Sequence, residues 1–387
     1  MQSIKTFKNK IIKSIKNKTL PFVNLYTKHS SIDNNLIVLV SFFGRNIGDN
    51  PGGIYDYLKD SGYEVVFLVK RPEDYPDVNC VRMYSMKSYI LLRKAKLIIS
   101  NSRMTPKWIK KEGQTYIQTW HGTPLKRLVH DLEVFNMPSA DSIEDYFKLF
   151  DDEVKRWDYL LSPCPFTTEK LRSAFQYEGE VLEIGYPRNQ KLFDYKQEDI
   201  SEIKKKLGLE VDDKVILYAP TYRDNLNRGV GKYYFNTPLE FDKLRKEFPE
   251  YKILIRYHYS IVESEDFENE NIINVSQYDD IADLYLVSDV LITDYSSVFF
   301  DYSILEKPFL FFMYDIEEYA NDLRGFYLDV YNDFPIKPVT TTEGIIEQLK
   351  NIDNYNFKDF SDEYNPKENI HCKDKLLSCI NEIMESK

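Results

Sequence analysis

From residue 36 onward, short apolar runs alternate with amphipathic stretches, and each apolar run ends in a polar or glycine-rich turn. Leu36–Phe43 and Glu64–Val69 are almost entirely apolar, which is typical of strands covered on both faces. Tyr55–Ser61, between them, has the pattern of a helix. This alternation predicts a parallel sheet with helices on both sides. Further strands of this half are expected at Lys96–Ser100, Gln114–Gln118, Tyr159–Ser162 and Val181–Ile184, and helices at Ser88–Lys94 and, with a threonine cap, Thr167–Phe175.

The same alternation starts again after residues 191–213, which are charged and lack strand character. We interpret this stretch as an interdomain connection, because 387 residues exceed what a single core comfortably accommodates. The sequence thus predicts an α/β fold with two Rossmann-like domains, at 36–195 and 210–387, the second including a terminal helix at Lys367–Met384. The strands expected in the second half are Lys214–Ala219, Tyr251–Ile255, Ile272–Val275, Val290–Thr293 and Pro308–Met313.

Residues 1–30 form a separate, basic segment. Ile4, Phe7 and Ile11 recur at helical spacing, and lysines fill most of the positions between the apolar ones. This pattern predicts an amphipathic helix that lies in a membrane interface, with its lysines near anionic headgroups. An amphipathic helix packed on the acidic body, or a frayed terminus, is the alternative. No apolar run reaches the ~20 residues that span a bilayer, and no secretory signal core follows the early lysines.

Charge is distributed unevenly along the chain. Residues 1–28 contain seven lysines and neither arginine nor acidic residues, so this end carries +7 while the whole chain carries −11. The remaining body, at −18, lacks the broad basic face of a nucleic-acid binder. A basic end on an acidic body indicates contact with an anionic surface through that end alone.

Metal-binding and nucleotide-loop motifs are missing from the sequence. The four cysteines (Cys80, Cys164, Cys372 and Cys379) are scattered without zinc spacing and are expected to be reduced thiols. There is no HExxH or DxD pair and no GxxxxGK[ST] loop, and the glycine-rich run 44–53 lacks GxGxxG spacing. We therefore expect neither a metal nor a bound cofactor.

Thr119–Lys126 reads Thr-Trp-His-Gly-Thr-Pro-Leu-Lys and directly follows a predicted strand. His121 therefore stands at the carboxyl edge of a sheet, where open α/β proteins place their ligands. An imidazole there can take a proton from an attacking hydroxyl near neutral pH. The alternative is a buried histidine that bonds to backbone at a domain seam.

Arg256-Tyr257-His258 stands at a predicted strand end of the second half, as His121 does in the first. Arg256 and His258 point to one side of an extended chain and suit a phosphate or diphosphate. If the two domains face each other, both histidines meet in one cleft. Taken alone, the tripeptide is also compatible with a capped strand end.

A third signal is the stretch Thr293–Asp301, in which a strand end runs into two serines that open a helix. Ser296 and Ser297 can cap backbone N–H groups, and the same helix start can hold a phosphate. Asp301, about one turn on, can accept hydrogen bonds from ribose hydroxyls. A plain capped helix with a solvated Asp301 is the alternative. Basic side chains at other turn ends together predict a cationic cleft for an anionic substrate: Lys126, Arg188, Arg223 and Arg324.

These motifs, in this order, resemble the CDP-glycerol glycerophosphotransferases of wall teichoic acid synthesis, over roughly residues 36–350. The resemblance implies a metal-independent GT-B fold with two Rossmann-like domains facing across a cleft, the first on the acceptor side and the second binding CDP-glycerol. It also implies transfer of glycerol phosphate from CDP-glycerol to a hydroxyl of an undecaprenyl-diphosphate-linked disaccharide acceptor, with release of CMP. The matching stretches are Trp120–Pro124, Gly185–Asn189, Ala219–Arg223, Arg256–His258, Thr293–Ser297 with Asp301, and Leu323–Tyr327.

The resemblance also assigns roles to single residues. His121 inherits the role of candidate base, and His258 with Arg256 would hold the diphosphate, so both histidines are candidate catalytic residues. Arg223 and Arg324 are additional candidates. The positions that match donor-binding residues of the family are Trp120, His121, Gly122, Thr123, Pro124, Arg188, Pro220, Thr221, Arg256, Tyr257, His258, Ser296, Ser297 and Asp301.

The subtype and the donor leave alternatives open. Long polymerases of this family carry an additional amino-terminal domain, so the compact chain resembles the primase-type members, which add one or a few units. The lysine-rich segment 1–30 would suit a peripheral enzyme on the cytoplasmic face of the cell membrane. Ribitol-phosphate transferases share the motifs, so CDP-ribitol is an alternative donor. A GT-B nucleotide-sugar glycosyltransferase or epimerase, and an inactive membrane-bound scaffold, are competing hypotheses.

Overall fold

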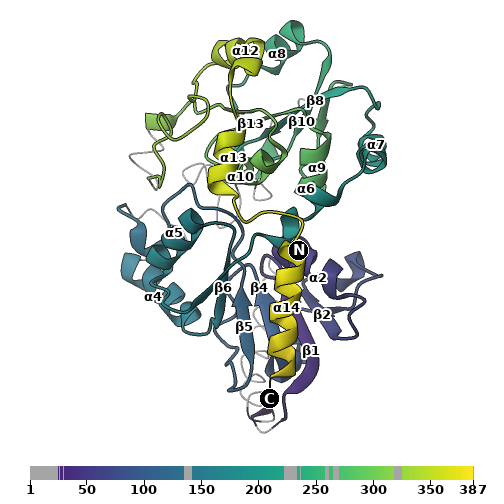
Figure 1. Cartoon of the computed structure of the whole chain (residues 1–387), viewed down its shortest axis with the longest axis vertical. Coiled ribbons are helices and arrows are strands. Elements are labelled where there is room, and N and C mark those ends of the chain that lie inside the picture. The colour runs from purple at the N-terminus through teal and green to yellow at the C-terminus, as the bar shows by residue number, and fades with distance from the viewer. Residues whose placement is uncertain are drawn as a thin grey trace, which may run out of the picture.

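The computed structural model describes residues 30–134, 142–221, 237–257, 270–317 and 325–386, together with residues 25, 27, 28, 233–235 and 261–264. The basic segment 1–30 thus lies almost entirely outside the described residues, and so do Arg223, His258 and Arg324. Figure 1 shows two lobes stacked along the long axis of the molecule, each built around its own sheet. Across the described ranges, no helix is long and apolar enough to cross a membrane.

The first lobe contains a seven-stranded sheet in the order β3-β2-β1-β4-β5-β6-β7, and all its strand pairs are parallel. Successive side chains of a strand point to opposite faces. Leu36 and Val38 of β1 therefore enter the core on one face, while Ile37 and Leu39 enter the core on the other. The strands are β1 (Asp33–Val40), β2 (Glu64–Val69), β3 (Cys80–Arg82), β4 (Ala95–Ser100), β5 (Thr115–Gln118), β6 (Tyr159–Ser162) and β7 (Glu180–Glu183).

The second lobe contains a five-stranded parallel sheet in the order β12-β10-β8-β13-β14. Its core is rich in aromatic rings: Phe299 lies within 5.0 Å of Phe311 and 5.3 Å of Phe334, measured between ring centroids. The predicted α/β fold with parallel sheets is confirmed. The strands are β8 (Lys214–Ala219), β10 (Tyr251–Ile255), β12 (Ile272–Asn274), β13 (Val290–Thr293) and β14 (Phe309–Phe311), with a separate pair β9 (Tyr233–Phe235) and β11 (Ile261–Ser264).

The helices cover the sheets and join the lobes. The expected threonine cap of α5 is wrong, because this helix begins earlier and Cys164 Sγ accepts the Thr167 amide at 3.4 Å. The α-helices are α2 (Asp49–Leu58), α3 (Met86–Lys94), α4 (Ile143–Val154), α5 (Pro165–Phe175), α6 (Lys191–Asp194), α7 (Gln197–Lys206), α8 (Phe241–Glu247), α9 (Ile281–Val287), α10 (Val298–Tyr302), α12 (Thr342–Lys350), α13 (Lys358–Tyr364) and α14 (Cys372–Glu385). The 3₁₀ helices are η1 (Pro72–Asp74), η2 (Val129–Asp131), η3 (Pro187–Asn189), η4 (Ser303–Leu305) and η5 (Ile352–Asn354).

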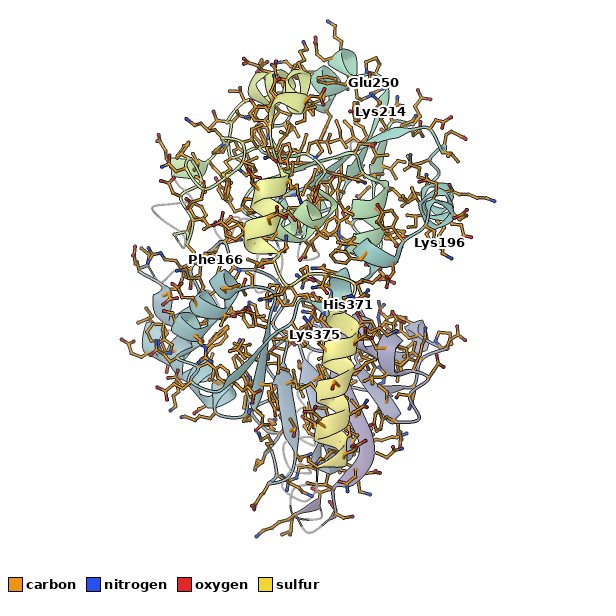
Figure 2. The ribbon with its side chains drawn as sticks, viewed as in Figure 1. Phe166, Lys196, Lys214, Glu250, His371 and Lys375 are labelled. Atoms are coloured by element: carbon orange, nitrogen blue, oxygen red, sulfur yellow. The ribbon has the colours of Figure 1, made fainter. Side chains whose placement is uncertain are left out.

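The terminal helix α14 packs on the first sheet and not on the second, as Figure 1 shows. Leu376 and Ile380 share one apolar cluster with Ile37 and Leu39 of β1. The sequence analysis placed this helix within the second domain, and its packing differs because the chain crosses back after α13. Figure 2 places His371, at the start of α14, at the level where the two lobes meet.

Each sheet has a point where the chain reverses its direction of winding, between β1 and β4 in the first and between β8 and β13 in the second. Ligands of open α/β sheets bind outside the carboxyl ends of the strands at such points. The carboxyl ends of the two sheets meet at the seam between the lobes. A Cβ atom placed on Gly122, which follows β5, would lie only 3.0 Å from Ser297 Oγ, which follows β13.

Candidate active site

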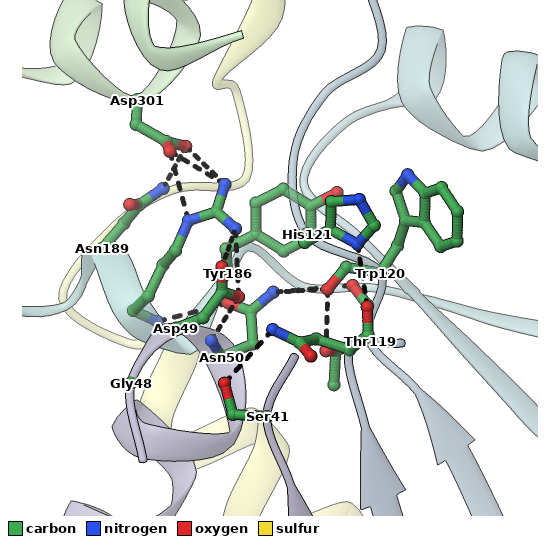
Figure 3. A network of polar contacts seen from close by, with 12 residues as sticks. Ser41, Gly48, Asp49, Asn50, Thr119, Trp120, His121, Tyr186, Asn189 and Asp301 are labelled. Carbon is green, nitrogen blue, oxygen red and sulfur yellow. Dashed lines mark hydrogen bonds and ion pairs between the residues drawn. The ribbon is translucent and has the colours of Figure 1, made fainter. Parts of the chain in front are cut away.

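Strand β5 ends at Gln118 and delivers Trp120 and His121 to the seam (Figure 3). Trp120 has a φ of +50°, and its amide donates to Gln118 Oε1 at 2.9 Å. A left-handed backbone is unusual for so bulky a residue, and such strain clusters at functional sites. The Trp120 ring packs against Phe175, at 4.7 Å, and lies 4.2 Å from the His121 ring. The side chain of Trp120 therefore anchors the start of the loop Trp120–Pro124, which we call the histidine loop.

The His121 ring is held in one tautomer. Its Nδ1 lies 2.8 Å from the carbonyl oxygen of Asn101. Because a carbonyl only accepts, Nδ1 carries the proton and Nε2 of the neutral ring presents a lone pair. The ring bonds to backbone at the seam, as the alternative interpretation held, but the residue is exposed and not buried. The arrangement is therefore suited to a general base that faces the space between the lobes.

The pKa of His121 is lowered from its ordinary value. Protein atoms packed around part of the ring disfavour the charged imidazolium, and nearby Arg188 acts in the same direction. The hydrogen bond to Asn101 and the charge of Asp49 oppose the shift without cancelling it. A lowered pKa leaves the imidazole neutral, and thus basic, at neutral pH.

Gly122, Thr123 and Pro124 form the turn that follows the histidine. Gly122 has a φ of +143°, and its lack of a side chain permits the close approach of Ser297. Thr123 and Pro124 are buried, and Thr167 Oγ1 donates to Thr123 Oγ1 at 3.2 Å. This turn therefore anchors the histidine loop to α5 and brings it against the second lobe.

Arg188 connects the two lobes through two carboxylates, as Figure 3 shows with Asp49 of α2 and Asp301 of α10 on opposite sides of the network. Its Nη2 donates to Asp301 Oδ2 at 2.8 Å, and its Nη1 donates to Asp49 Oδ1 at 3.2 Å. All three side chains are about nine-tenths buried, with exposed fractions of 11%, 11% and 9%. The charge of Arg188 is thus compensated, which differs from the expectation of a cation available to substrate.

Asp301 accepts from Asn189 Nδ2 at 3.1 Å as well as from Arg188. Its oxygens are therefore engaged across the seam in this structure, whereas the sequence analysis proposed ribose hydroxyls as their partners. The same Asn189 amide donates to Glu368 Oε1 at 3.0 Å, and the Tyr186 amide donates to that oxygen at 2.9 Å. Burial raises the pKa of the Glu368 carboxyl to about 8.

The sequence analysis missed the side chains that hold this network, namely Asp49, Asn50, Asn189 and Glu368. Asn50 is buried, and its Nδ2 donates to the carbonyl oxygen of Trp120 at 3.4 Å. The glycine-rich run 44–53 was the available signal. A Cβ on Gly53 would lie 2.6 Å from the carbonyl oxygen of Pro187, so this glycine lets α2 pack directly on η3. The run thus serves helix packing at the seam.

The second-lobe motifs form a connected pair of loops. The Thr221 amide donates to Asp294 Oδ1 at 2.8 Å, and the Tyr295 amide donates to the same oxygen at 2.6 Å. Pro220 is buried beside them. Ser296 and Ser297 precede α10, but the Ser297 side chain makes no capping hydrogen bond. The expected serine cap at Ser297 is therefore wrong, and its hydroxyl lies instead against Gly122.

Arg256 and Tyr257 follow β10, as predicted, and their side chains differ in their surroundings. Tyr257 packs in the core of the second lobe, and its amide donates to Ser276 Oγ at 2.9 Å. Arg256 Nη1 donates to the carbonyl oxygen of Tyr278 at 2.6 Å. Burial lowers the pKa of Arg256, and the charges of Tyr285, Asp280 and Asp279 oppose this shift without cancelling it. A half-buried guanidinium that forms no ion pair within the described ranges is suited to an anionic ligand.

The side chains of the described residues also bear on metal binding. In these ranges, no group of three or more histidine, cysteine, aspartate or glutamate side chains is arranged to hold a metal ion. The four cysteines are free thiols, with Cys164 and Cys372 buried.

Two facing parallel sheets with a histidine at their seam define a GT-B-like fold. Residues 22–379 match the family model of the CDP-glycerol:poly(glycerophosphate) glycerophosphotransferases. The chain belongs to this family.

Curated relatives include polymerases and a transferase of teichoic acid synthesis. The chain is 42% identical over 364 residues to the teichoic acid poly(glycerol phosphate) polymerase of Staphylococcus epidermidis, covering 91% of this chain but only 50% of that protein. It is 41% identical to the polymerase of the same description from Bacillus spizizenii, covering 85% of this chain and 87% of the relative. It is 39% identical to the teichoic acid glycerol-phosphate transferase of Staphylococcus aureus, covering 89% of this chain and 90% of the relative.

These relatives bear on the expected primase type. Glycerol-phosphate primases of Bacillus spizizenii and Bacillus subtilis are 30% and 27% identical to this chain, less than the polymerases. One polymerase is also covered over most of its own length. A short chain therefore does not distinguish primases from polymerases. The identities are higher to the polymerases than to the primases, which favours a polymerase over the expected primase type.

A solved structure of the wall teichoic acid polymerase TagF superposes with a TM-score of 0.89 at 39% identity, covering 99% of this chain and 97% of that chain. The UDP-GlcNAc 2-epimerase from Neisseria meningitidis superposes with a TM-score of 0.51 at 14% identity, over 90% of this chain and all of that one. The epimerase similarity shows a shared fold alone.

Proposed function

We propose that this protein transfers glycerol phosphate from CDP-glycerol to a hydroxyl group of a lipid-linked teichoic acid acceptor, releasing CMP. The observation that carries the proposal is the His121 ring, held by Asn101 so that its unprotonated Nε2 faces the seam where the two sheets converge. Membership of the glycerophosphotransferase family supplies the reaction class. A variant of the related polymerase has been soaked with CDPG, which supports this donor.

In the proposed reaction, His121 Nε2 takes the proton of the acceptor hydroxyl. The hydroxyl oxygen then bonds to the phosphorus that carries glycerol, and the bond between this phosphorus and the bridging oxygen breaks. CMP leaves with that electron pair. Positioning and stabilisation of developing charge then supply most of the catalysis. In this scheme Arg256, with the predicted His258, holds the diphosphate.

We divide the chain for this reaction as the sequence suggested, with residues 36–195 on the acceptor side and residues 210–387 on the CDP-glycerol side, except that α14 packs on the first sheet. The donor positions proposed in the second lobe are Pro220, Thr221, Arg256, Tyr257, His258, Ser296 and Ser297. Trp120, His121, Gly122, Thr123 and Pro124 approach the donor from the first lobe. Arg188 and Asp301 hold the lobes together through their ion pair, and they meet the donor only if this pair opens.

The donor is tested by incubating the purified protein separately with CDP-glycerol, CDP-ribitol and UDP-GlcNAc, each with a lipid-linked disaccharide acceptor. We expect CMP from CDP-glycerol and little nucleotide from the other two. The ribitol-phosphate primase of Bacillus spizizenii is 26% identical over 84% of this chain, less than the 39% to 42% of the three glycerol-phosphate relatives described above, which favours glycerol. If CMP is released from CDP-ribitol alone, the donor is CDP-ribitol and not CDP-glycerol. If only UDP-GlcNAc reacts and UDP is released, the proposed glycerophosphotransferase reaction is wrong.

The product is tested by mass spectrometry of the acceptor after reaction with CDP-glycerol. Because identity is greater to polymerases than to primases, we expect several glycerol phosphate units on each acceptor. Addition of a single unit would instead assign the primase role.

We further propose that residues 1–30 bring the enzyme to the anionic, cytoplasmic face of the cell membrane, where such an acceptor resides. The seven lysines of residues 1–28 support this, since each lysine near an anionic surface contributes about 1 kcal/mol. Deleting residues 1–28 should abolish sedimentation with anionic vesicles but leave CMP release from soluble substrates intact. Equal sedimentation of the deleted protein would reject the role.

A further inference from the structure

A pocket of about 290 Å³ lies between η2, α5 and the second-lobe segment that contains Phe326 and Tyr327. We call it the seam pocket; it is lined by Arg127, Asp131, Glu169, Lys170, Ser173, Phe326 and Tyr327. Its residues come from the segment after the Trp-His-Gly turn, from α5 and from the second lobe. None of them is among the proposed donor positions. The seam pocket is therefore a separate site that both lobes build.

The position of the seam pocket relative to His121 is fixed by backbone hydrogen bonds across the seam. The Tyr327 amide donates to the Leu125 carbonyl at 2.8 Å, and the Arg127 amide donates to the Gly325 carbonyl at 3.2 Å. The second-lobe wall is thus fastened to the segment that begins four residues after His121. The Phe326 ring also stacks on Tyr295, at 5.5 Å between centroids. The second-lobe wall of the pocket is therefore in contact with the segment that follows the histidine loop and with Tyr295 of the Asp-Tyr-Ser-Ser motif.

Two cations of the seam pocket have ion-pair partners that are exposed to solvent, while Arg127 Nε also donates to the carbonyl oxygen of Phe326 at 3.3 Å. Arg127 Nη1 lies 2.7 Å from Glu133, whose side chain is 70% exposed, and Lys170 Nζ lies 2.6 Å from Glu169, whose side chain is 73% exposed. Such solvated ion pairs contribute little and exchange readily for another anion. Lys170 also lies 5.9 Å from the centre of the Tyr327 ring. Both cations can therefore turn to a phosphate group in the pocket.

The polar floor of the seam pocket is ordered. Asp131 accepts from Ser173 Oγ at 2.6 Å and from the Tyr327 hydroxyl at 2.5 Å, and the Leu128 amide donates to the same Tyr327 oxygen. Hydroxyl and carboxylate groups of this kind exchange hydrogen bonds with a polyol. Small-molecule sites begin at about 300 Å³, so the space suits one polyol phosphate unit.

We propose that the seam pocket binds a phosphodiester-linked polyol unit of the growing acceptor and so directs the terminal hydroxyl of that chain to His121. This proposal rests on the proposed function. Arg127 and Lys170 bind the phosphodiester, and Asp131 with Ser173 bind the polyol hydroxyls. An acceptor that already carries glycerol phosphate fills the pocket, whereas a bare lipid-linked disaccharide does not reach it.

The test compares the double variant Arg127→Gln/Lys170→Gln with the intact protein. Two lipid-linked disaccharides serve as acceptors, one with three glycerol phosphate units and one with none. For the extended acceptor we expect KM to rise at least about tenfold, the effect of losing roughly 1.4 kcal/mol of binding. KM for CDP-glycerol and KM for the bare acceptor should not change. The matched control is Arg82→Gln/Lys350→Gln, which removes an arginine and a lysine from exposed ion pairs elsewhere.

An unchanged KM for the extended acceptor would overturn the proposal. An equal rise for both acceptors would also overturn it, because the cations would then bind the lipid diphosphate. A soluble tri(glycerol phosphate) provides a test that needs no catalysis: calorimetry should detect its binding to the intact protein and weaker binding to the double variant. If the intact protein binds this probe but releases no CMP from CDP-glycerol, the proposed function fails while the seam pocket stands. Single Arg127→Lys and Lys170→Arg variants, which keep the charge, should retain binding.

Discussion

His121 Nδ1 donates a hydrogen bond to the carbonyl oxygen of Asn101 at 2.8 Å, and this bond determines which nitrogen of the ring is basic. Asn101 directly follows β4, and His121 follows the neighbouring strand β5. Adjacent parallel strands thus present the base and the group that orients it at one edge of the sheet. The orientation depends on a backbone atom, so no side chain at position 101 is required for it.

Replacing His121 with alanine should reduce the rate of CMP release about 10²- to 10⁴-fold, the usual contribution of a positioned general base. Folding should survive, because the residue is exposed and its ring makes one hydrogen bond. A coupled CMP assay and a melting curve measure the two effects. His371→Ala, at the exposed start of α14, is the matched control and should retain full activity. If the His121→Ala enzyme releases CMP at an unchanged rate, His121 is not the general base.

The pH dependence of the reaction follows from the lowered pKa of His121. The neutral, active form of a base is lost when the pH falls through its pKa. Because this pKa lies below the usual value of about 6.5, kcat/KM should be constant through neutral pH and decline only in the more acidic range. A pH–rate profile with saturating acceptor measures this. An acidic limb centred above neutrality would contradict the lowered pKa.

Breaking the Arg188–Asp301 pair should destabilise the protein, because all the participating side chains are largely buried. Arg188→Gln leaves Asp49 and Asp301 without their cation and should cost about 3–5 kcal/mol of unfolding free energy, the range for a broken buried pair. Asp301→Asn should cost less, since Arg188 keeps Asp49. Urea unfolding gives both values. Lys59→Gln, which removes an exposed ion pair with Asp56, is the control. A larger loss of unfolding free energy for Asp301→Asn than for Arg188→Gln would contradict an Arg188 that pairs with both Asp49 and Asp301.

Glu368 makes stability depend on pH. Its folded pKa of about 8 lies above the ordinary 4.5, so the folded state keeps a proton that the unfolded state releases. Stability is therefore greatest below the ordinary pKa and declines as the pH rises through this window, by up to about 1.4 kcal/mol per unit.

Glu368→Gln keeps an oxygen for the amides of Tyr186 and Asn189 but cannot ionise. Its stability relative to the intact protein should therefore increase from pH 5 to about 8 and then level off. Chemical unfolding across that range measures the difference, with exposed Glu347→Gln as the control. A difference that does not vary with pH would contradict a protonated Glu368.

Gly122→Ala should impair activity more than it impairs stability. The added methyl group would lie 3.0 Å from Ser297 Oγ and would push the histidine loop away from the second lobe. Gly208→Ala and Gly62→Ala also occur at positive φ, but nothing lies within 4 Å of the added atom, so they report the backbone strain alone. We expect the two controls to share the small stability loss of about 1 kcal/mol while keeping CMP release. Full activity of Gly122→Ala would show that the contact with Ser297 is not needed.

The sequence predicted the strands more closely than the helices. Glu64–Val69, Tyr159–Ser162, Lys214–Ala219, Tyr251–Ile255 and Val290–Thr293 end where the structure ends them. Apolar runs of this kind are recognisable because a parallel strand is buried on both faces. Helix α4 was missed, although Ile143–Val154 carries a serine N-cap and an acidic first turn.

The partners of the site residues were not predictable in the same way. The sequence indicates that Arg188 follows one strand and that Asp301 lies in the helix after another strand. It does not show that the two side chains face each other. Both side chains were expected to contact a ligand, but in the structure they form an ion pair that joins the two lobes. For Arg256, a role in holding the diphosphate stays a prediction.

The sequence by itself determined the two parallel α/β units, the placement of motifs at strand ends and the family, because burial pattern and local turn chemistry are properties of neighbouring residues. Tertiary structure alone decided that Asn101 selects the His121 tautomer, that α14 covers the first sheet, and that Arg127 and Tyr327 share a pocket. Those relationships join residues far apart along the chain, and their energies depend on distances that only the packing of the two lobes sets.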